Sequence, residues 1–468
     1  MRASIPVLYR LGRWLLRAAL GFYFARIERF HRERVPPTGP VLFVSNHPNS
    51  ITDAFIIAVS VPQKVNFVAT VQLFRLAPIR WLLTRCGVIP VNRVRDDPRA
   101  MRTVRDTFDA CFGALEKGEA VGLFPEGITH DDPQLKTVKS GAARMAIELE
   151  HRHTGKLGLR IAPAGLTFSA KERFRSEVLV HFGEPILAAD FLADYPEKKH
   201  ACIHALSQAI QHRIEELMLH LPTLERARIV DAVRRLYLDR LLVGNRVIHE
   251  PVPPRAGELM LTQAIARAVE FTCEHHPERA ARFAQRLDRY EGWLKRLNLS
   301  DAELARLPAA AWRVWHGLGW TLLGVALFPV ALFGWLHRLL PLLVVRRAIR
   351  QFAQPSANKT RISTIAILAG LISFGVIYGA FVILFHAFFG LPASFWYALS
   401  LPAASLLTHY YLRSLVRIAL GARSLWVIFH APIAARRLRA MREALIAEIE
   451  AARWQVPADA LTRQPKGE

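Results

Sequence analysis

Three long hydrophobic segments in the C-terminal third constrain the chain most strongly, because each must be buried in protein or in lipid. Segments 317–336, 364–385 and 391–412 contain no aspartate, glutamate, lysine or arginine. Each reaches the roughly 20 residues that a helix needs to cross the hydrocarbon core of a bilayer. We therefore expect an integral membrane protein whose membrane region covers residues 306–420.

Basic residues flank these segments and predict their orientation. Arginine and lysine are concentrated in 337–362 and again in 413–423, and such residues favour the cytoplasmic side. The second and third segments are then expected to form a hairpin. The first segment, interrupted by Pro329, would be re-entrant or interfacial, with three full spans as the alternative. The expected location is the inner or plasma membrane, with a catalytic domain facing the cytoplasm.

The chain carries a large positive charge that needs an anionic partner. Lysine and arginine number 62 against 39 acidic residues, which gives a formal net charge of +23. Nucleic acid, anionic lipid or a phosphorylated substrate could meet this charge. A hydrophobic content of 52% favours lipid, and no nucleic-acid-binding motif is present. We therefore expect anionic membrane lipids as partners, and no nucleic acid.

Residues 1–30 are predicted to form an amphipathic helix in the membrane interface. The longest uncharged run, 18–25, is too short to span a bilayer. Arginines at helical spacing share one face, and apolar residues form a stripe beside them. The arginines are Arg10, Arg13 and Arg17, and the stripe is Leu11, Trp14, Leu15, Ala18 and Phe22.

Residues 31–195 have the pattern of an α/β domain. Short β-rich runs alternate with helical stretches near 99–117 and 139–153, which is typical of a buried sheet covered by helices. Residues 196–305 are charged and helical throughout, and 421–468 read as a basic amphipathic tail. The β-rich runs are 40–45, 65–69, 88–91, 120–124, 160–166 and 178–183.

The first candidate for chemistry is the sequence SNHPNSITDAF, which follows a strand-like run. His47 lies at the end of that run, and Asp53 lies in the first turn of an apolar helix. A histidine held by a carboxylate is what deprotonating an alcohol requires. The alternative is structural, because Ser50 and Asp53 also have the spacing of a capping box.

Three further groups of residues lie at strand ends or turns. Arg93 closes the run GVIPVNR, where its guanidinium could bind phosphate. Glu126 and Gly127 form a turn in LFPEGITHDD, and Lys136 and Lys139 precede the next helix. A predicted hairpin turn carries a basic group. Each feature taken alone is also compatible with a solvated turn. The basic group is Lys171, Arg173 and Arg175.

The order and spacing of four blocks carry more weight than any one residue. The set NH…D, GVIPVNR, FPEG and IAPAG over about 120 residues resembles the glycerolipid acyltransferase superfamily. Within it, FPEGITHDDPQLKTVKSGAARMA and KERFRS…VHFGEPI look most like the fungal-type glycerol-3-phosphate/dihydroxyacetone-phosphate acyltransferases. The resemblance implies a central mixed sheet flanked by helices, and acyl transfer from acyl-CoA or acyl carrier protein to a glycerol phosphate or lysophospholipid.

The resemblance also implies roles for individual residues. His47 would be the general base, and Asp53 would orient it. Substrate would be bound by a set of polar and basic residues near them, and neither a metal nor a cofactor beyond the acyl-donor cosubstrate is implied. The implied substrate-binding set is Asn46, Arg93, Glu126, Gly127, Lys139, Arg173 and Arg175.

One departure and two alternatives remain open. Five residues separate His47 from Asp53, where most of the superfamily has four, so the intervening loop must absorb the extra residue. The acceptor could be 1-acylglycerol-3-phosphate rather than glycerol-3-phosphate. A protein of another class, an inactive lipid-binding membrane scaffold, would also fit if the longer spacing prevented the His47–Asp53 contact.

Overall fold

The computed structural model describes residues 6–91, 101–221, 223–244, 252–305, 310–353, 359–453 and 456–457. The chain forms two compact units. Unit 1 contains residues 1–220, 251–259 and 349–367, and unit 2 contains 221–250, 260–348 and 368–468. Segments far apart in sequence therefore belong to one unit, and the beginning of a long apolar helix belongs to unit 1.

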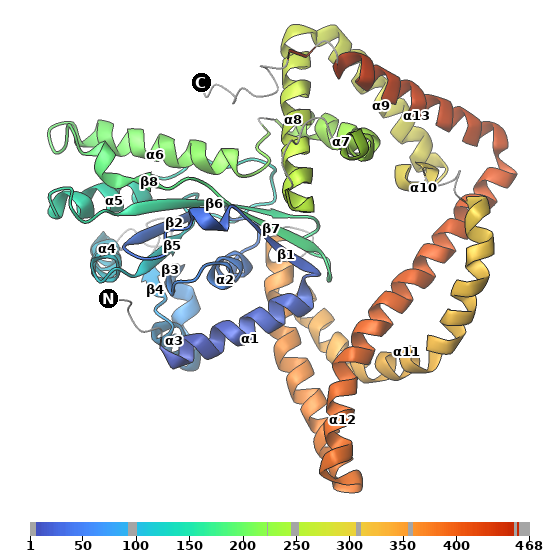
Figure 1. Cartoon of the computed structure of the whole chain (residues 1–468), viewed down its shortest axis with the longest axis horizontal. Helices are drawn as coiled ribbons and strands as arrows, with labels where there is room; N and C mark the ends of the chain where they lie inside the picture. Colours follow the sequence, from blue (N-terminus) through green and yellow to red (C-terminus); the bar gives the residue numbers. More distant parts are fainter. Residues whose placement is uncertain are drawn as a thin grey trace. The chain divides into compact units, whose positions relative to one another are not determined.

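A mixed sheet forms the centre of unit 1 (Figure 1). Its strand order is β1-β7-β6-β2-β5-β3-β4, and β8 pairs with β6. Most neighbouring strands are parallel, whereas β6 is antiparallel to both β7 and β8. The strands are β1 Arg26–Phe30, β2 Val41–Ser45, β3 Val65–Thr70, β4 Ile89–Val91, β5 Ala120–Leu123, β6 Arg160–Phe168, β7 Glu177–Phe182 and β8 Ile186–Leu187.

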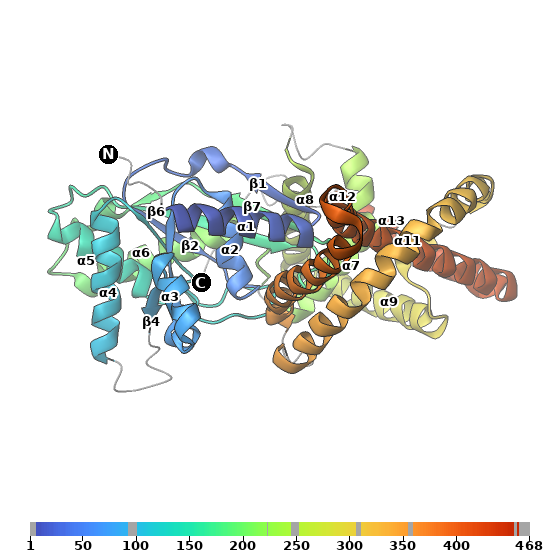
Figure 2. The same cartoon turned by 90° about the horizontal axis from the view of Figure 1, so that it is seen from below.

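Helices cover both faces of this sheet, so its central strands are buried on both sides. Along β2, Leu42 and Val44 pack into one hydrophobic cluster, whereas Val41 and Phe43 pack into the other. One cluster includes α4 Met101–Glu116, α5 Gly141–Arg152 and α6 Lys199–Glu216. The other includes α1 Val7–Tyr23 and α2 Ile51–Ser60, which lie side by side (Figure 2). The short helix α3 Ala77–Arg85 precedes β4.

The structure confirms the predicted α/β fold with a mixed sheet, and all six β-rich runs form strands. Two boundaries differ from the prediction. The N-terminal helix ends at Tyr23, and Arg26–Phe30 form the strand β1 instead of continuing the helix. Helix α6 belongs to unit 1, because Ile203, Leu206 and Ile210 pack into its core.

Helix α1 is amphipathic, as its sequence predicts. Its inner face packs through Leu20 and Tyr23 against the core of unit 1. Its outer face exposes large apolar side chains, which is the character of a helix that lies in a membrane interface. These exposed residues are Val7, Leu11, Trp14, Leu15 and Phe22.

The described part of unit 2 is helical. It contains α7, most of α8, α9, α10, α11, most of α12, and α13. Residues 432–453 of the predicted tail form α13, which packs against α9 and joins it through Arg286 and Glu448. The bounds are α7 Leu224–Gly244, α8 Pro254–His275, α9 Pro277–Arg296, α10 Asp301–Ala305, α11 Ala310–Phe352, α12 Ile362–His430 and α13 Pro432–Arg453.

Two helical regions are long and apolar enough to cross a membrane, Gly324–Phe352 and Lys359–Leu420. The second is broken at Gly390, whose φ of 73° and ψ of 177° are not helical. The chain reverses there, and the rings of Phe385 and Tyr397 stack with centroids 4.3 Å apart. Segments 364–385 and 391–412 therefore form the predicted hairpin (Figure 1).

The first hydrophobic segment lies in α11, a continuous helix of 43 residues that contains Pro329 and Pro341. A re-entrant turn is therefore wrong for this segment, whereas the interfacial position and the full span stay predictions. Neighbouring helices can satisfy the backbone groups that a proline frees in a membrane helix. A proline at 329 frees the carbonyl of Val325, and α11 continues through this position. The hydroxyl of Thr408 on α12 lies 3.0 Å from the Ala331 carbonyl, which is a separate contact between the two helices.

We predict that His181 makes unit 1 sensitive to acid. Burial, with the nearby charges of His31 and Arg34, lowers the pKa of His181 on β7 from 6.5 to about 4. The unfolded chain then binds this proton more readily than the native protein, so stability falls as the pH drops from 6.5 to about 4, by about 3 kcal/mol. The unfolding temperature of the detergent-solubilised protein should decrease as the pH is lowered from 6.5 to about 4. The decrease should be smaller for His181→Gln. Equal slopes for both proteins would contradict the prediction.

Candidate active site

The end of β2 and the start of α2 bring His47 and Asp53 together. The Nδ1 atom of His47 lies 2.9 Å from Oδ2 of Asp53. The Asp53 side chain is completely buried, whereas that of His47 is 15% exposed. The pair thus has a buried, orienting carboxylate and an imidazole that is accessible from one side.

The loop between them absorbs the extra residue at Ser50. This residue adopts φ 53° and ψ −140°, an unusual conformation for a residue with a side chain, and α2 begins directly after it. The Ser50 side chain makes no capping hydrogen bond, so the capping-box alternative is wrong for this residue. Instead, Asp53 Oδ2 accepts a hydrogen bond of 2.7 Å from the Asn49 N–H.

These contacts set the electrostatics of Asp53. Burial raises the pKa of its carboxyl, while hydrogen bonds from His47 and the Asn49 N–H, together with the charge of Lys171, oppose that rise. The second oxygen, Oδ1, is buried and has no hydrogen-bond partner among the described residues. The ionised form of Asp53 therefore depends on its contact with His47.

Glu126 fixes the backbone around the pair. Its Oε1 accepts a 2.9 Å hydrogen bond from the His47 N–H, and its Oε2 accepts bonds from the Lys136 N–H and from His130. Its side chain is completely buried. Both oxygens of Glu126 thus accept hydrogen bonds from protein donors, and its predicted contact with glycerol hydroxyls stays a prediction.

Phe124 and Gly127 shape the surroundings of the imidazole. The Phe124 ring stacks on His47 at 3.9 Å between centroids with 10° between the planes. Gly127 adopts φ +68°, and a Cβ there would lie 2.7 Å from Nζ of Lys139. Lys139 is exposed and makes no ion pair with any described residue. Its ammonium group thus lies beside the FPEG turn, where the sequence predicts an anion-binding residue.

Asn46 has a structural position. Its Nδ2 donates to the Leu166 carbonyl at 3.0 Å, and its Oδ1 accepts from the Leu166 N–H at 2.7 Å. The residue is 4% exposed. These bonds tie the end of β2 to β6, so Asn46 has a structural role, and its contact with substrate stays a prediction.

The basic hairpin turn divides into three different environments. Arg175 donates to the carbonyls of Gly21, Phe22 and Phe24 and so caps the end of α1, while its role in substrate binding stays a prediction. Arg173 is exposed at the turn. Lys171 contacts Asp131 and donates to the Pro48 carbonyl at 2.7 Å, next to His47. Arg93 lies outside the described residues.

The first turn of α12 contributes two buried hydroxyl groups that the sequence did not single out. Ser363 donates to Asn49 Oδ1 at 2.7 Å. Thr364 accepts from the Thr52 N–H at 3.3 Å, and its hydroxyl lies 2.8 Å from that of Thr52. Thr52 is in the first turn of α2, whose N–H groups lack helical partners. A residue 312 positions away thus supplies the cap that Ser50 does not.

Comparison with known proteins identifies this part of the chain. Residues 26–167 match the acyltransferase family. Glycerol-3-phosphate O-acyltransferase 1 of Saccharomyces cerevisiae is 23% identical over 51% of this chain and 43% of its own length. The 1-acyl-sn-glycerol-3-phosphate acyltransferase of Bacillus subtilis is 28% identical over 41% of this chain and 87% of its own length. Residues 26–167 form an acyltransferase domain of the glycerolipid acyltransferase superfamily.

The extent of these matches is limited. The chain spans less than half the length of the fungal relatives, 43% of one yeast protein and 18% of two others. The crystal structure of the 1-acyl-sn-glycerophosphate acyltransferase of Thermotoga maritima covers 45% of this chain and 79% of its own, with 17% identity and a TM-score of 0.34.

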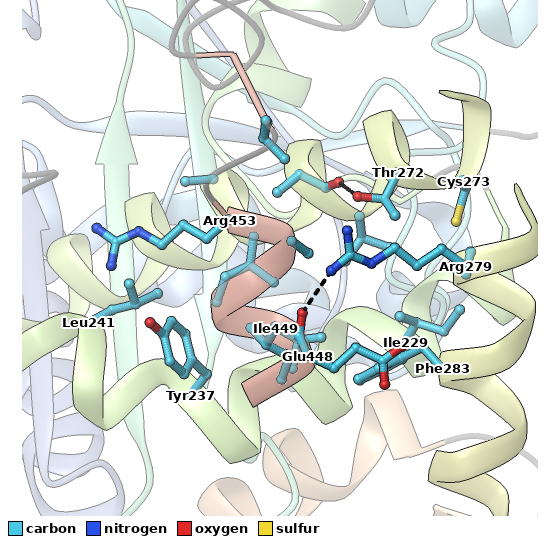
Figure 3. A pocket seen from close by; sticks show the side chains of 18 of the residues that line it. Ile229, Tyr237, Leu241, Thr272, Cys273, Arg279, Phe283, Glu448, Ile449 and Arg453 are labelled. Atoms are coloured by element: carbon cyan, nitrogen blue, oxygen red, sulfur yellow. Dashed lines mark hydrogen bonds between the residues drawn. The ribbon is translucent and has the colours of Figure 1, made fainter. Parts of the chain in front are cut away.

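Two other kinds of site were considered. Among the described residues, no group of three or more histidine, cysteine, aspartate or glutamate side chains could hold a metal ion. Unit 2 contains an apolar pocket between α7, α8, α9 and α13 (Figure 3). Arg279 donates across it to the Glu448 carbonyl at 3.3 Å. None of the residues predicted for the acyltransferase site lines this pocket.

We predict that Asn46→Leu lowers stability without a specific loss of substrate affinity. The change leaves the N–H and carbonyl of Leu166 without their partners, at a cost of about 2 kcal/mol. The melting temperature of the purified protein should fall, and KM for each substrate should stay within about twofold in the folded fraction. An unchanged melting temperature with a raised KM would instead show that Asn46 binds substrate.

Proposed function

We propose that this protein is a membrane-bound O-acyltransferase. It would move a fatty acyl chain from acyl-CoA, or from acyl carrier protein, to a hydroxyl group of glycerol-3-phosphate or a related glycerol phosphate. The observation that carries this proposal is the 2.9 Å contact between His47 and the completely buried Asp53. It is the arrangement that a general base for alcohol activation needs, and it lies within the acyltransferase domain.

The contacts of His47 indicate where its proton lies. Asp53 Oδ2 accepts from the Asn49 N–H and, as a carboxylate, can only accept from His47. Nδ1 therefore carries the hydrogen, and Nε2 keeps its lone pair. Stacking on Phe124 and the backbone hydrogen bond to Glu126 hold the ring in one orientation. Nε2 is thus the atom that would take a proton from the acceptor.

The reaction would proceed by direct transfer. Nε2 of His47 takes the proton of the acceptor hydroxyl as its oxygen attacks the thioester carbonyl carbon. The tetrahedral intermediate then expels the thiolate, which receives the proton from His47, so that an ester and a free thiol result. Asp53 stabilises the imidazolium that forms between these steps. No covalent acyl-enzyme is required.

The acceptor phosphate would be bound by basic residues beside the FPEG turn. Lys139 lies there with an exposed ammonium group, and Arg93 retains its predicted role. The alternative acceptor, 1-acylglycerol-3-phosphate, is the substrate in the name of the Bacillus subtilis relative, 87% of whose length is matched. The yeast relative is named for glycerol-3-phosphate. An inactive lipid-binding scaffold is less well supported, since the longer spacing still allows the His47–Asp53 contact.

The surroundings of the site suit work at a membrane surface. Helix α1 exposes apolar side chains, and two helical regions are long enough to cross a bilayer. We propose that the protein lies in the inner or plasma membrane, with the acyltransferase domain facing the cytoplasm and anionic lipids around it. The amphipathic donor and the phosphorylated acceptor would meet at this interface.

We predict that His47→Ala abolishes acyl transfer, with a loss of about a thousandfold or more in kcat, and that Asp53→Asn loses about a hundredfold. The assay is transfer of labelled palmitate from palmitoyl-CoA by the membrane-reconstituted protein. Glycerol-3-phosphate, dihydroxyacetone phosphate and 1-acylglycerol-3-phosphate are offered separately, and the preferred acceptor identifies the substrate class. Turnover that persists in His47→Ala would refute the mechanism. Its complete absence in the wild type, with either donor, would favour the scaffold.

We also predict that Thr364→Val lowers kcat about tenfold, because the isosteric change removes the hydroxyl that caps α2 beside Asp53. KM for palmitoyl-CoA should be unchanged, and Thr364→Ser should restore the rate. Ser373→Ala is the matched control, since it removes another buried hydroxyl of α12, one bonded to the Pro341 carbonyl. Equal losses in Thr364→Val and Ser373→Ala would show a general effect on α12 and no specific positioning of the site.

A further inference from the structure

Three arginines of unit 1 converge on a pocket that the proposed acyl transfer does not use. Arg17 comes from α1, Arg29 from β1, and Arg32 from the single helical turn that follows β1. The pocket has a volume of about 540 Å³. We call these three residues the arginine cluster. Phe24, Ile27 and Val59 add apolar surface to the pocket wall.

The positive charge of the arginine cluster is not neutralised by the protein. None of the three guanidinium groups forms an ion pair with a carboxylate of a described residue. Arg17 has one long contact of 3.5 Å with the Val59 carbonyl, and Arg29 has one of 3.4 Å with the Ile27 carbonyl. Each guanidinium carries five N–H donors, so most of the donors are left for another partner.

Neighbouring arginines differ in this respect. Arg26, which also lines the pocket, pairs with Glu28 at 3.3 Å, and Arg34 pairs with Glu184 at 2.7 Å. Burial lowers the pKa of the Arg29 guanidinium, and the positive charges of Arg32 and Arg17 lower it further. The arginine cluster thus gathers like charges at an energetic cost that an anion in the pocket would remove.

The position of the arginine cluster indicates which anion. Arg17 lies on α1 beside the exposed apolar stripe of that helix, where Trp14 is 65% and Leu11 59% exposed. When such a stripe enters a membrane interface, arginines at its border lie at the level of the lipid phosphates. The apolar side chains of α1 can then contact an acyl chain while the guanidinium groups contact its headgroup.

We propose that Arg17, Arg29 and Arg32 form a binding site for the phosphate headgroup of an anionic phospholipid. A phosphate monoester suits the site best, because three guanidinium groups can share its two negative charges. The proposal deepens the proposed function, since it rests on the membrane location given there. The same phosphate chemistry occurs in coenzyme A, and the test separates these two sources.

The test measures thermal unfolding of the full-length protein in an uncharged detergent. Dioctanoyl phosphatidic acid, dioctanoyl phosphatidylcholine, free coenzyme A and inorganic phosphate are titrated separately. Phosphatidic acid should raise the unfolding temperature of the wild type in a saturable way, and phosphatidylcholine should not. The double variant Arg29→Gln/Arg32→Gln should bind phosphatidic acid at least about tenfold more weakly. Without ligand it should be no less stable than the wild type, because like charges have been removed.

Arg10 supplies a matched control. It lies on the same side of α1 as Arg17, two helical turns away, and it does not line the pocket. Arg10→Gln and Arg17→Gln remove the same charge from the same helix. Arg17→Gln should weaken binding of phosphatidic acid, whereas Arg10→Gln should not. Arg32→Lys, which keeps the charge but loses the planar donor geometry, should fall between Arg32→Gln and the wild type.

Three results would overturn the proposal. Equal weakening by Arg10→Gln and Arg17→Gln would indicate general surface charge and no defined site. Coenzyme A that stabilises the wild type through the arginine cluster, and displaces phosphatidic acid, would assign the site to the acyl donor. Binding unaffected by the double variant would place the lipid elsewhere. Acyl transfer measured on the same preparations reports on the proposed function separately, since none of these arginines contacts His47 or Asp53.

Discussion

The burial of the Asp53 carboxylate is the constraint on which the candidate site depends. A buried charge is costly unless hydrogen bonds and an opposite charge compensate it. Here the compensation comes from the imidazole of His47 and the N–H of Asn49, both in the short loop between β2 and α2. The buried charge of Asp53 therefore requires the loop conformation, the orientation of the imidazole and the position at which α2 starts. This arrangement requires a backbone conformation at Ser50 that residues other than glycine rarely adopt.

Two other buried side chains, those of Glu126 and Asn46, connect this loop to neighbouring parts of unit 1. Glu126 binds the His47 backbone on one side and the segment containing His130 and Lys136 on the other, so the FPEG turn and the histidine move as one. Asn46 ties the end of β2 to β6. Both residues belong to the motifs that characterise the superfamily, and both are engaged with protein atoms. In this structure these two motif residues hold the backbone of the candidate site in place through hydrogen bonds to protein atoms.

The difference between prediction and structure follows from the kind of signal that each element leaves in a sequence. Strands buried on both faces, such as β2, are continuous apolar runs and were predicted. The strand β1, with the sequence RIERF, has no such run because it lies at the sheet edge and pairs only with β7. Distance in sequence explains the rest: the cap that Arg175 provides for α1 joins residues more than 150 positions apart, and no local pattern reports such a contact.

Ser363 and Thr364 connect the acyltransferase domain directly to the apolar helix α12. An anchor needs only apolar length, and a flexible linker would be enough to hold the domain near the bilayer. Here the first turn of α12 is instead built into unit 1, where its hydroxyls bind Asn49 and Thr52, two residues between His47 and Asp53. Thr52 immediately precedes Asp53, so a displacement of this turn would disturb the residue that orients His47. The loop that holds His47 and Asp53 is thus completed by the beginning of α12, a helix that is long and apolar enough to cross a membrane.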